Sequence, residues 1–220
     1  MKPEEIIQRR VARELRPGTL VNLGIGLPTG VAQFISPHDG ILFQSENGIV
    51  GMGARPPEGM EWDDLTDAGG GFVTAVPGAA RVDSATSFGL IRGGHLDATV
   101  LGGLEVDEAG RLANWMVPGR MAPGMGGAMD LVTGARRVIV AMQHTARGTP
   151  KIVPACALPL TSTRRVTLIV TDLAVIEPTE EGLALRERAP DVTVEDILAA
   201  TSARLIVGAH TPEMDLRPPA

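Results

Sequence analysis

Residues 137–142 read Arg-Val-Ile-Val-Ala-Met, and residues 166–171 read Val-Thr-Leu-Ile-Val-Thr. Short runs of β-branched and aliphatic residues like these are typical of strands that are buried on both faces. Further runs that favour strands lie at 19–23, 41–43, 72–76 and 98–102. Strands buried on both faces occur mainly in parallel sheets that helices cover. The sequence therefore predicts an α/β fold with an open, mostly parallel sheet flanked by helices.

Helix signals separate these strands, as an α/β fold requires. Residues 3–15 carry apolar side chains at helical spacing, with glutamates in the first turn and Pro17-Gly18 as a stop. Further helices are predicted at about 28–35, from about 128 onward and at about 193–201, and a hairpin at about 174–187. We expect one domain over residues 1–220, with a loose tail from about 211 to 220.

The composition limits the classes of partner. The 220 residues are 44% hydrophobic and 21% charged, which is typical of a globular chain that does not span a membrane. The net charge of −6 argues against nucleic acid and anionic membrane surfaces as partners. The single cysteine, Cys156, cannot form an internal disulfide, and its apolar surroundings favour an inert thiol. Together with a polar, charged N-terminal helix, these features predict a cytoplasmic protein.

A glycine turn follows the predicted strand at 19–23. The pattern Gly24-x-Gly26-x-x-x-Gly30 resembles a dinucleotide-binding fingerprint, and Glu46 lies about 20 residues further on, where such folds place a ribose-binding acid. The spacing is one residue longer than in that fingerprint, however, and Pro28 interrupts the direct run into a helix. The turn can equally let the backbone approach a bulky ligand, with the Asn22 amide beside it, or be a plain strand-to-helix turn.

Glu46 stands just after the predicted strand at 41–43, in the segment Ser45-Glu46-Asn47-Gly48. The carboxyl ends of strands line the ligand crevice of open α/β sheets. Taken alone, a carboxylate at such a place serves an ion pair more often than catalysis. A carboxylate nucleophile needs positioning, exclusion of water and amide donors, and glycine-rich loops such as 118–127 can supply all three.

Two other chemistries lack a sequence pattern. The histidines show no metal-ligand spacing, and the lone cysteine has no histidine partner. No Gly-x-Ser-x-Gly elbow is present. We therefore expect neither a metal site nor serine hydrolase chemistry.

The segment Leu42-Phe43-Gln44-Ser45-Glu46-Asn47-Gly48-Ile49-Val50-Gly51 resembles the Ser-Glu-Asn-Gly signature of family I CoA-transferases, specifically the B subunit of the 3-oxoacid enzymes. The similarity covers about residues 4–207. It includes the segments 21–29, 91–95, 112–116, 124–131 and 171–175.

The resemblance implies a mechanism in which Glu46 attacks the acyl-CoA carbonyl. An acyl-glutamyl anhydride forms first and a Glu46–CoA thioester second, and an acceptor carboxylate then takes up CoA. CoA is thus implied as a substrate, and no cofactor is implied. The Asn22 side chain and the backbone amides of Gly127 and Ala128 are implied to contact the thioester intermediate and CoA. The full set of residues implied to bind substrate or CoA is Asn22, Gly24, Gly26, Asn47, Gly126, Gly127 and Ala128.

The resemblance also suggests substrates and a partner. The family's commonest pair is succinyl-CoA and acetoacetate, and the run Trp115–Gly119 is closer to acetoacetate-type members. Asp67 and Gly70 stand where the family usually has asparagine and lysine, so a possible cation near the site is missing. A separate A subunit is implied to complete the enzyme as an A₂B₂ assembly. Two alternatives keep Glu46: an acyl-CoA hydrolase, and a nucleotide-binding regulatory subunit in which Glu46 binds a ribose.

Overall fold

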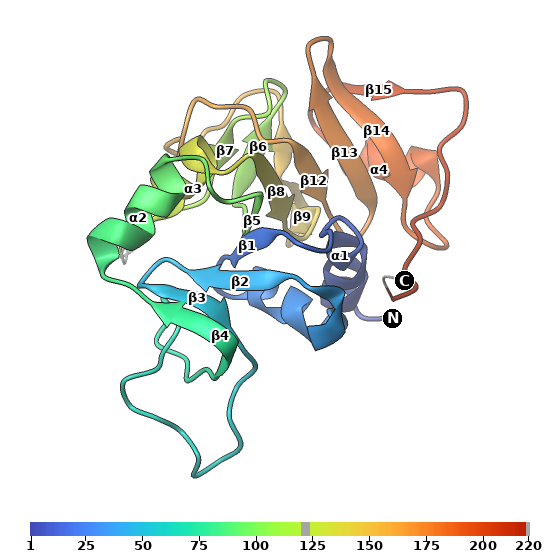
Figure 1. Cartoon of the computed structure of the whole chain (residues 1–220). Coiled ribbons are helices and arrows are strands. Elements are labelled where there is room, and N and C mark those ends of the chain that lie inside the picture. Colours follow the sequence, from blue (N-terminus) through green and yellow to red (C-terminus); the bar gives the residue numbers. More distant parts are fainter. Residues whose placement is uncertain (120–123, 219–220) are drawn as a thin grey trace.

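A computed structural model describes residues 1–119 and 124–218 of the chain. Its main feature is a ten-stranded sheet (Figure 1). From edge to edge the strands are β15 (Leu205–Val207), β14 (Gly182–Arg188), β13 (Ala174–Thr179), β12 (Leu168–Val170), β8 (Arg137–Ala141), β5 (Ala98–Leu101), β1 (Leu20–Leu23), β2 (Leu42–Ser45), β3 (Ile49–Met52) and β4 (Ala75–Arg81). The helices are α1 (Pro3–Ala12), α2 (Ser84–Arg92), α3 (Ala128–Gly134) and α4 (Val194–Ala199), with the 3₁₀ helices η1 (Leu27–Phe34) and η2 (Pro37–Asp39).

Two small sheets accompany the large one. The first joins β11 (Ile152–Val153), β6 (Glu105–Asp107) and β7 (Leu112–Ala113), and the second joins β10 (Thr149–Pro150) and β9 (Thr145–Ala146). Their strands are only two or three residues long, too short to leave a periodic pattern in the sequence.

The centre of the large sheet is parallel. Strands β2, β1, β5, β8 and β12 all run in one direction. Antiparallel partners extend the sheet at both edges, β3 and β4 on one side and β13 and β14 on the other. All four residues of β5 are buried, as expected for a strand with helices on both faces. The predicted open, mostly parallel sheet is confirmed.

Helices cover both faces of the parallel centre, and the strands supply a core to each face. In β8, Val138 and Val140 pack in the core that includes Ile91 of α2 and Leu131 of α3, whereas Ile139 belongs to the core on the opposite face, with α1 and η1. This alternation follows from the two-residue period of a strand. Within the described residues, no helix combines the length and the apolar character needed to cross a bilayer.

Most predicted elements are present, but three segments differ from expectation. Residues 27–34 form a 3₁₀ helix rather than an α-helix, after Gly26 with its positive φ of 87°. The chain beyond Glu46 does not enter a loop at once, because β3 first returns along β2 and the irregular loop begins at Gly53. Helix α2 was not predicted, although Asp83 caps it by accepting a hydrogen bond of 2.7 Å from the Thr86 amide.

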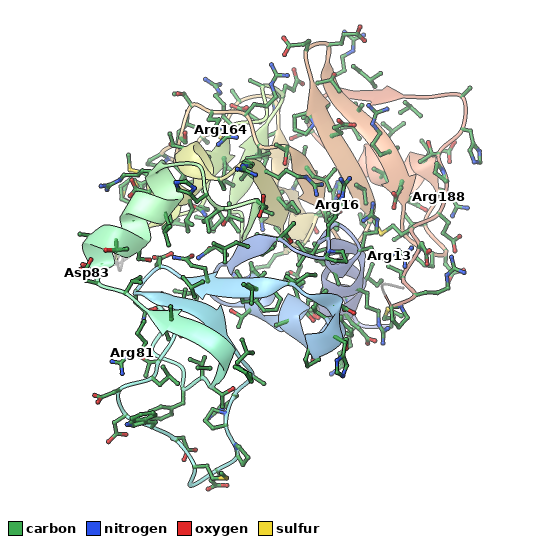
Figure 2. The ribbon with its side chains drawn as sticks, viewed as in Figure 1. Arg13, Arg16, Arg81, Asp83, Arg164 and Arg188 are labelled. Carbon is green, nitrogen blue, oxygen red and sulfur yellow. The ribbon has the colours of Figure 1, made fainter. Side chains whose placement is uncertain are left out.

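The chain end packs against the last strands of the sheet. The Arg188 amide donates to Pro212, and the Met214 amide donates to the Arg188 carbonyl. Ion pairs join Arg13 to Asp215 at 2.9 Å and Arg188 to Glu213 at 3.2 Å. Arg13 and Arg188 accordingly lie on the side of the molecule where the chain ends (Figure 2). Residues 212–215 of the expected tail are therefore joined to the fold by hydrogen bonds and ion pairs.

Arg164 anchors helix α3 at its C-terminal end (Figure 2). Its guanidinium donates to the carbonyls of Val132, Thr133 and Ala135 at 2.6–2.9 Å and to that of Arg136 at 3.2 Å. The last carbonyls of a helix lack partners within the helix, so a cation at this place satisfies them. The anchor holds the C-terminal end of α3, and the N-terminal end of this helix forms part of the site described below.

His144 is a buried polar group at the C-terminal end of the parallel strands. It follows β8, and its ring nitrogens lie 2.9 Å from the Thr171 hydroxyl and 2.8 Å from the Thr201 hydroxyl. Burial lowers the pKa of His144 to about 4, because the charged ring would lose its hydration. The ring is therefore neutral at physiological pH and accepts or donates one hydrogen bond at each nitrogen.

We predict that His144 makes stability depend on pH below neutrality. An unfolded histidine takes up its proton near pH 6.5, whereas the folded one does so only near 4, so the unfolding free energy falls as the pH drops between these values. From pH 7 to pH 5 the expected loss is about 2 kcal/mol. Urea unfolding of wild type and His144→Gln at both pH values measures it, and the variant should lack this part of the slope. The prediction would be contradicted if wild type and His144→Gln lost the same unfolding free energy between pH 7 and pH 5 and NMR showed the folded His144 ring titrating near pH 6.5.

Candidate active site

Glu46 lies directly beyond the end of β2, in a tight turn that leads into β3. The Gly48 amide closes this turn by donating to the Ser45 carbonyl at 3.0 Å. Gly48 has a positive φ of 124°, which residues with a side chain rarely adopt. The turn holds the Glu46 backbone rigidly at the carboxyl end of a parallel strand, where open α/β sheets bind ligands.

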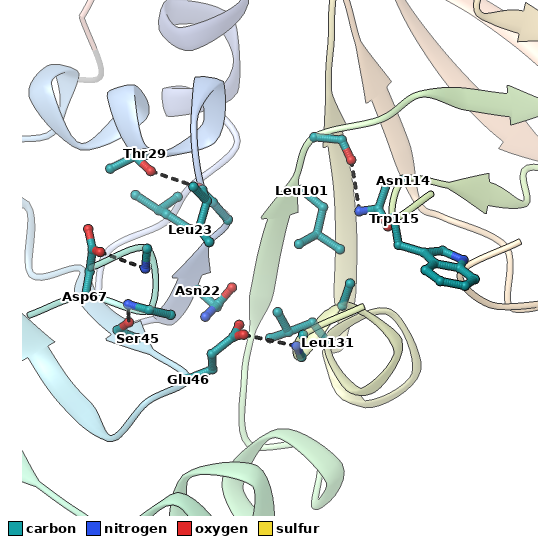
Figure 3. Close-up of a pocket in the computed structure, with 18 of the residues that line it drawn as sticks. Asn22, Leu23, Thr29, Ser45, Glu46, Asp67, Leu101, Asn114, Trp115 and Leu131 are labelled. Atoms are coloured by element: carbon teal, nitrogen blue, oxygen red, sulfur yellow. Dashed lines mark hydrogen bonds between the residues drawn. The ribbon is translucent and has the colours of Figure 1, made fainter. Parts of the chain in front are cut away.

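The Glu46 side chain reaches across to the start of α3. Its Oε1 accepts a hydrogen bond of 3.0 Å from the Gly127 amide, and the side chain is half-buried (Figure 3). Burial raises the pKa of the Glu46 carboxyl above its ordinary value, the Gly127 hydrogen bond opposes the rise, and the like charge of Asp130 adds to it. The carboxylate is thus poorly hydrated but held in one place.

Gly127 leaves no room for a side chain beside this carboxylate. A Cβ atom at Gly127 would lie 2.8 Å from both Cδ and Oε1 of Glu46. The backbone there has φ −82° and ψ 3°, which other residues adopt freely, so the close approach and not the conformation requires glycine. The preceding Gly126 has φ 55° and completes the turn into the helix.

Ser45 and Asn47, on either side of Glu46, hold a neighbouring loop. The Ser45 hydroxyl accepts a hydrogen bond of 2.9 Å from the Ala68 amide, and the Asn47 side chain donates to the Thr66 carbonyl at 2.7 Å. The Ser-Glu-Asn run therefore joins the end of β2 to two other elements: Glu46 contacts the start of α3, while its two neighbours hold the loop between β3 and β4.

The side chains around Glu46 enclose a cavity of about 570 Å³ (Figure 3). This volume is within the range of small-molecule sites. The mouth of the cavity carries Ile25, which is 69% exposed. The lining comes from the end of β1 and the turn after it, from η1, and from the ends of β2 and β3. Loop residues 67–69, the end of β5 with the residues after it, the segment after β7 and the first part of α3 with the residues before it complete the lining.

The structure brings together most of the residues that the family resemblance implied. Asn22, Gly24, Gly126, Gly127 and Ala128 line the cavity with Glu46. Gly26 and Asn47 do not: Gly26 precedes η1, and the exposed side chain of Asn47 holds the loop instead. The Ala128 amide donates to Met125 at 3.4 Å, so Gly127 alone of the two expected amides meets Glu46.

Other wall residues were quoted for the family resemblance but had no predicted role. Asn114 donates to the Gly102 carbonyl at 3.1 Å, and the Trp115 indole donates to the Leu160 carbonyl at 3.3 Å. These bonds fix the wall opposite Glu46. The signal that could have found them is Asn114-Trp115 itself, a polar and aromatic pair just after a buried β-run.

The charged residues found in the lining are both acidic. They are Glu46 and Asp67, and among the described lining residues there is no lysine, arginine or histidine. Asp67 Oδ1 accepts hydrogen bonds from the Gly69 and Gly71 amides at 2.8 and 2.9 Å, which shapes the loop. Gly70 faces open space with a φ of 80°.

The remaining candidate groups lie elsewhere. Burial and the charges of Asp107 and Glu105 raise the pKa of the Cys156 thiol to about 12, so the thiol stays protonated and unreactive at neutral pH. No cluster of three metal-ligating side chains occurs in residues 1–119 and 124–218. Residues 120–123 of the predicted glycine- and proline-rich segment lie outside the described residues.

Comparison with known proteins places the chain in a family. The Coenzyme A transferase family matches residues 4–200. The chain is 52% identical to the beta subunit of the acetate CoA-transferase of Haemophilus influenzae, over 98% of this chain and 97% of that protein. It is 48% identical to the B subunit of the succinyl-CoA:3-ketoacid coenzyme A transferase of Helicobacter pylori, over 92% and 98% respectively.

A solved structure agrees at the level of the fold. The acyl-CoA transferase of Escherichia coli O157:H7 superposes with a TM-score of 0.80 at 24% identity, over 98% of this chain. This chain spans 44% of that longer protein. The chain therefore belongs to the Coenzyme A transferase family, as its Ser-Glu-Asn-Gly segment indicated.

Replacing Gly127 with alanine is predicted to displace the Glu46 carboxylate without disturbing the backbone. An error of about 1 Å in the position of a reacting group can cost about a hundredfold in rate, so we expect kcat/KM for CoA transfer to fall by about that factor. The matched control is Gly89→Ala, because a Cβ at Gly89 meets nothing within 4 Å. Both variants should have the melting temperature of wild type. A Gly127→Ala enzyme as active as the control would contradict the role of Gly127 in positioning the Glu46 carboxylate.

Proposed function

We propose that this chain transfers CoA from an acyl-CoA to a free carboxylate by a ping-pong mechanism, with Glu46 as the nucleophile. One observation carries the proposal: a half-buried carboxylate stands at a strand end, inside a cavity, with a backbone amide 3.0 Å from one of its oxygens. Membership of the Coenzyme A transferase family supports the reaction class.

In the proposed first half-reaction, the Glu46 carboxylate attacks the thioester carbonyl of the acyl-CoA. The C–S bond breaks, leaving an acyl-glutamyl anhydride and the CoA thiolate. The thiolate then attacks Cδ of Glu46, the anhydride C–O bond breaks, and the first acid leaves as its carboxylate. The product is a Glu46–CoA thioester. An acceptor carboxylate runs the same steps in reverse, so no ATP is consumed and the free carboxylate of Glu46 returns.

The geometry around Glu46 supports each of these steps. Burial removes part of the hydration of the carboxylate, which favours its attack on a carbonyl. When the thiolate attacks Cδ, negative charge develops on a carboxyl oxygen of Glu46, and the Gly127 amide already donates to Oε1. A preorganised donor at such an oxygen is typically worth on the order of a hundredfold or more in rate. Asn22 and Gly126 line the same cavity and remain proposed contacts of the intermediate.

The nucleotide-binding alternative receives less support. A dinucleotide fingerprint runs into an α-helix whose first amides bind a pyrophosphate. Here the glycine turn runs into the 3₁₀ helix η1 instead. The hydrolase alternative uses the same intermediate and differs only in whether water reaches it.

For the substrates, we propose the 3-oxoacid pair, succinyl-CoA and acetoacetate, in line with the Helicobacter pylori relative. A second candidate is transfer to and from acetate, in line with the Haemophilus influenzae relative. One observation supports this second candidate: a succinyl group carries a further carboxylate, which Glu46 and Asp67 in the lining would repel. We also propose a separate A subunit that completes the site as an A₂B₂ complex in the cytoplasm.

The nucleophile assignment predicts a trapped adduct on Glu46. With its A subunit and acyl-CoA but no acceptor, the wild-type enzyme should accumulate a Glu46–CoA thioester. Borohydride reduces this thioester and hydroxylamine cleaves it, and peptide mass spectrometry locates the change. Glu46→Gln should form no adduct and lose at least about a thousandfold in kcat, since the covalent route is absent. The exposed Glu58→Gln variant is the control. Turnover with Glu46 unmodified would refute the mechanism.

The acidic lining predicts that removing one charge changes substrate preference. Asp67→Asn keeps an oxygen that can accept from Gly69 and Gly71 but removes the negative charge. We expect kcat/KM for succinyl-CoA to rise about threefold to tenfold relative to acetyl-CoA, as partial screening of one charge pair allows. Asp64→Asn, an exposed neighbour in the same loop, should leave the ratio unchanged. An unchanged ratio in both variants would show that Asp67 does not select the acyl group.

A further inference from the structure

Four polar side chains are buried next to the cavity, in a part of the sheet where most buried side chains are apolar. They belong to neighbouring elements, namely helix α2, strand β2, strand β1 and strand β5. In that order they are Ser87, Gln44, Asn22 and Thr99. Asn22 is 2% exposed and the other three are fully buried. Asn22 is the cross-strand neighbour of both Gln44 and Thr99, so the three strand residues form one row across the sheet. We call this set the buried amide row.

Hydrogen bonds connect the row from end to end. Gln44 Nε2 donates to the Ser87 hydroxyl at 2.9 Å, and Asn22 Nδ2 donates to Gln44 Oε1 at 2.9 Å. The Thr99 hydroxyl donates to Asn22 Oδ1 at 3.2 Å. Each buried amide is therefore held at both its nitrogen and its oxygen end, which satisfies groups that would otherwise be costly in an apolar core.

The direction of these bonds is fixed by one backbone group. Hydroxyls both donate and accept, so Ser87 and Thr99 alone would allow both amides to be turned over with every bond reversed. Asn22 Nδ2, however, also donates to the main-chain carbonyl of Gln44 at 3.2 Å. In the reversed arrangement two oxygens would face each other there. The Asn22 nitrogen is consequently held toward β2, and its oxygen toward β5.

We infer that Gln44, Ser87 and Thr99 are positioning residues for CoA transfer, acting through the amide of Asn22 and the end of β2. Asn22 lines the cavity close to Glu46 (Figure 3), and Gln44 lies on β2, two residues before Glu46, which directly follows this strand. The row thus ties the amide in the cavity wall to the backbone that presents the nucleophile. This inference rests on the proposed function of Glu46.

A structural role alone does not account for the row. An apolar residue would satisfy the sheet face at these positions, as Leu101 does two residues after Thr99 on the same side of β5. Buried hydrogen-bonded networks add little net stability over apolar packing, but they fix orientation. Loss of one member should therefore disturb the reacting geometry more than the binding of acyl-CoA.

Thr99→Val tests the inference, because it keeps the shape of the side chain and removes only the hydroxyl. In complex with the A subunit, we expect kcat to fall about tenfold and KM for acyl-CoA to change less than about twofold. The fraction of Glu46 trapped as CoA thioester in a fixed short time should fall in parallel. Thr99→Ser retains the hydroxyl and should restore kcat to within about twofold of wild type.

Thr167→Val is the matched control, because Thr167 directly precedes β12 and its hydroxyl donates to the Val138 carbonyl of β8 at 2.8 Å, and neither residue lines the cavity. If Thr99→Val loses melting temperature like the control while keeping wild-type kcat, the row is merely structural and the inference is overturned. If Thr99→Val does not assemble, Ser87→Ala decides in the same assay. Failure of wild type to form a Glu46 adduct would instead refute the proposed function, so the two failures are distinguishable.

Discussion

The hydrogen bond from the Gly127 amide to Glu46 Oε1 joins the two halves of the site. Glu46 directly follows β2, and Gly127 directly precedes α3, 81 positions further along the chain. The turn closed by Gly48 positions Glu46, the acceptor of this 3.0 Å hydrogen bond. The Arg164 anchor holds α3, the helix that follows the donor. Both the Glu46 turn and α3 are held by the parallel sheet, which therefore sets the distance between the donor and the acceptor. The apolar runs at the centre of the sheet thus help to position the nucleophile.

Each residue of the Ser-Glu-Asn run has a separate physical task. Glu46 points into the cavity, while Ser45 and Asn47 bind the loop that carries Asp67. Asp67 in turn shapes this loop by accepting from two amides. A change at Asp67 therefore affects both a wall of the cavity and its charge. The departures from the family pattern at Asp67 and Gly70 fall on this loop and not on the turn that holds Glu46.

The sequence predicted what periodicity and strand position determine. The apolar runs at 137–142 and 166–171 correspond to β8 and β12. Glu46, which follows an apolar run, lies at the carboxyl end of a parallel strand, as predicted. It did not predict α2, because the helix buries only Ser87 and Ile91 and depends on the Asp83 cap and on packing against α3. It also did not predict the contacts of Asn47 or Gln44, which are made across the fold by residues 19 and 43 positions apart.

The way in which Glu46 is held suits a nucleophile better than an ion pair. A carboxylate with several donors or a nearby cation has a lowered pKa and reacts poorly as a nucleophile. Among the described residues, the Gly127 amide is the hydrogen-bond donor to Glu46, and it binds Oε1. This leaves Oε2 as the oxygen that attacks in the proposed mechanism. Burial and the charge of Asp130 both raise the pKa of Glu46. The surroundings therefore destabilise the carboxylate anion, which makes it a better nucleophile.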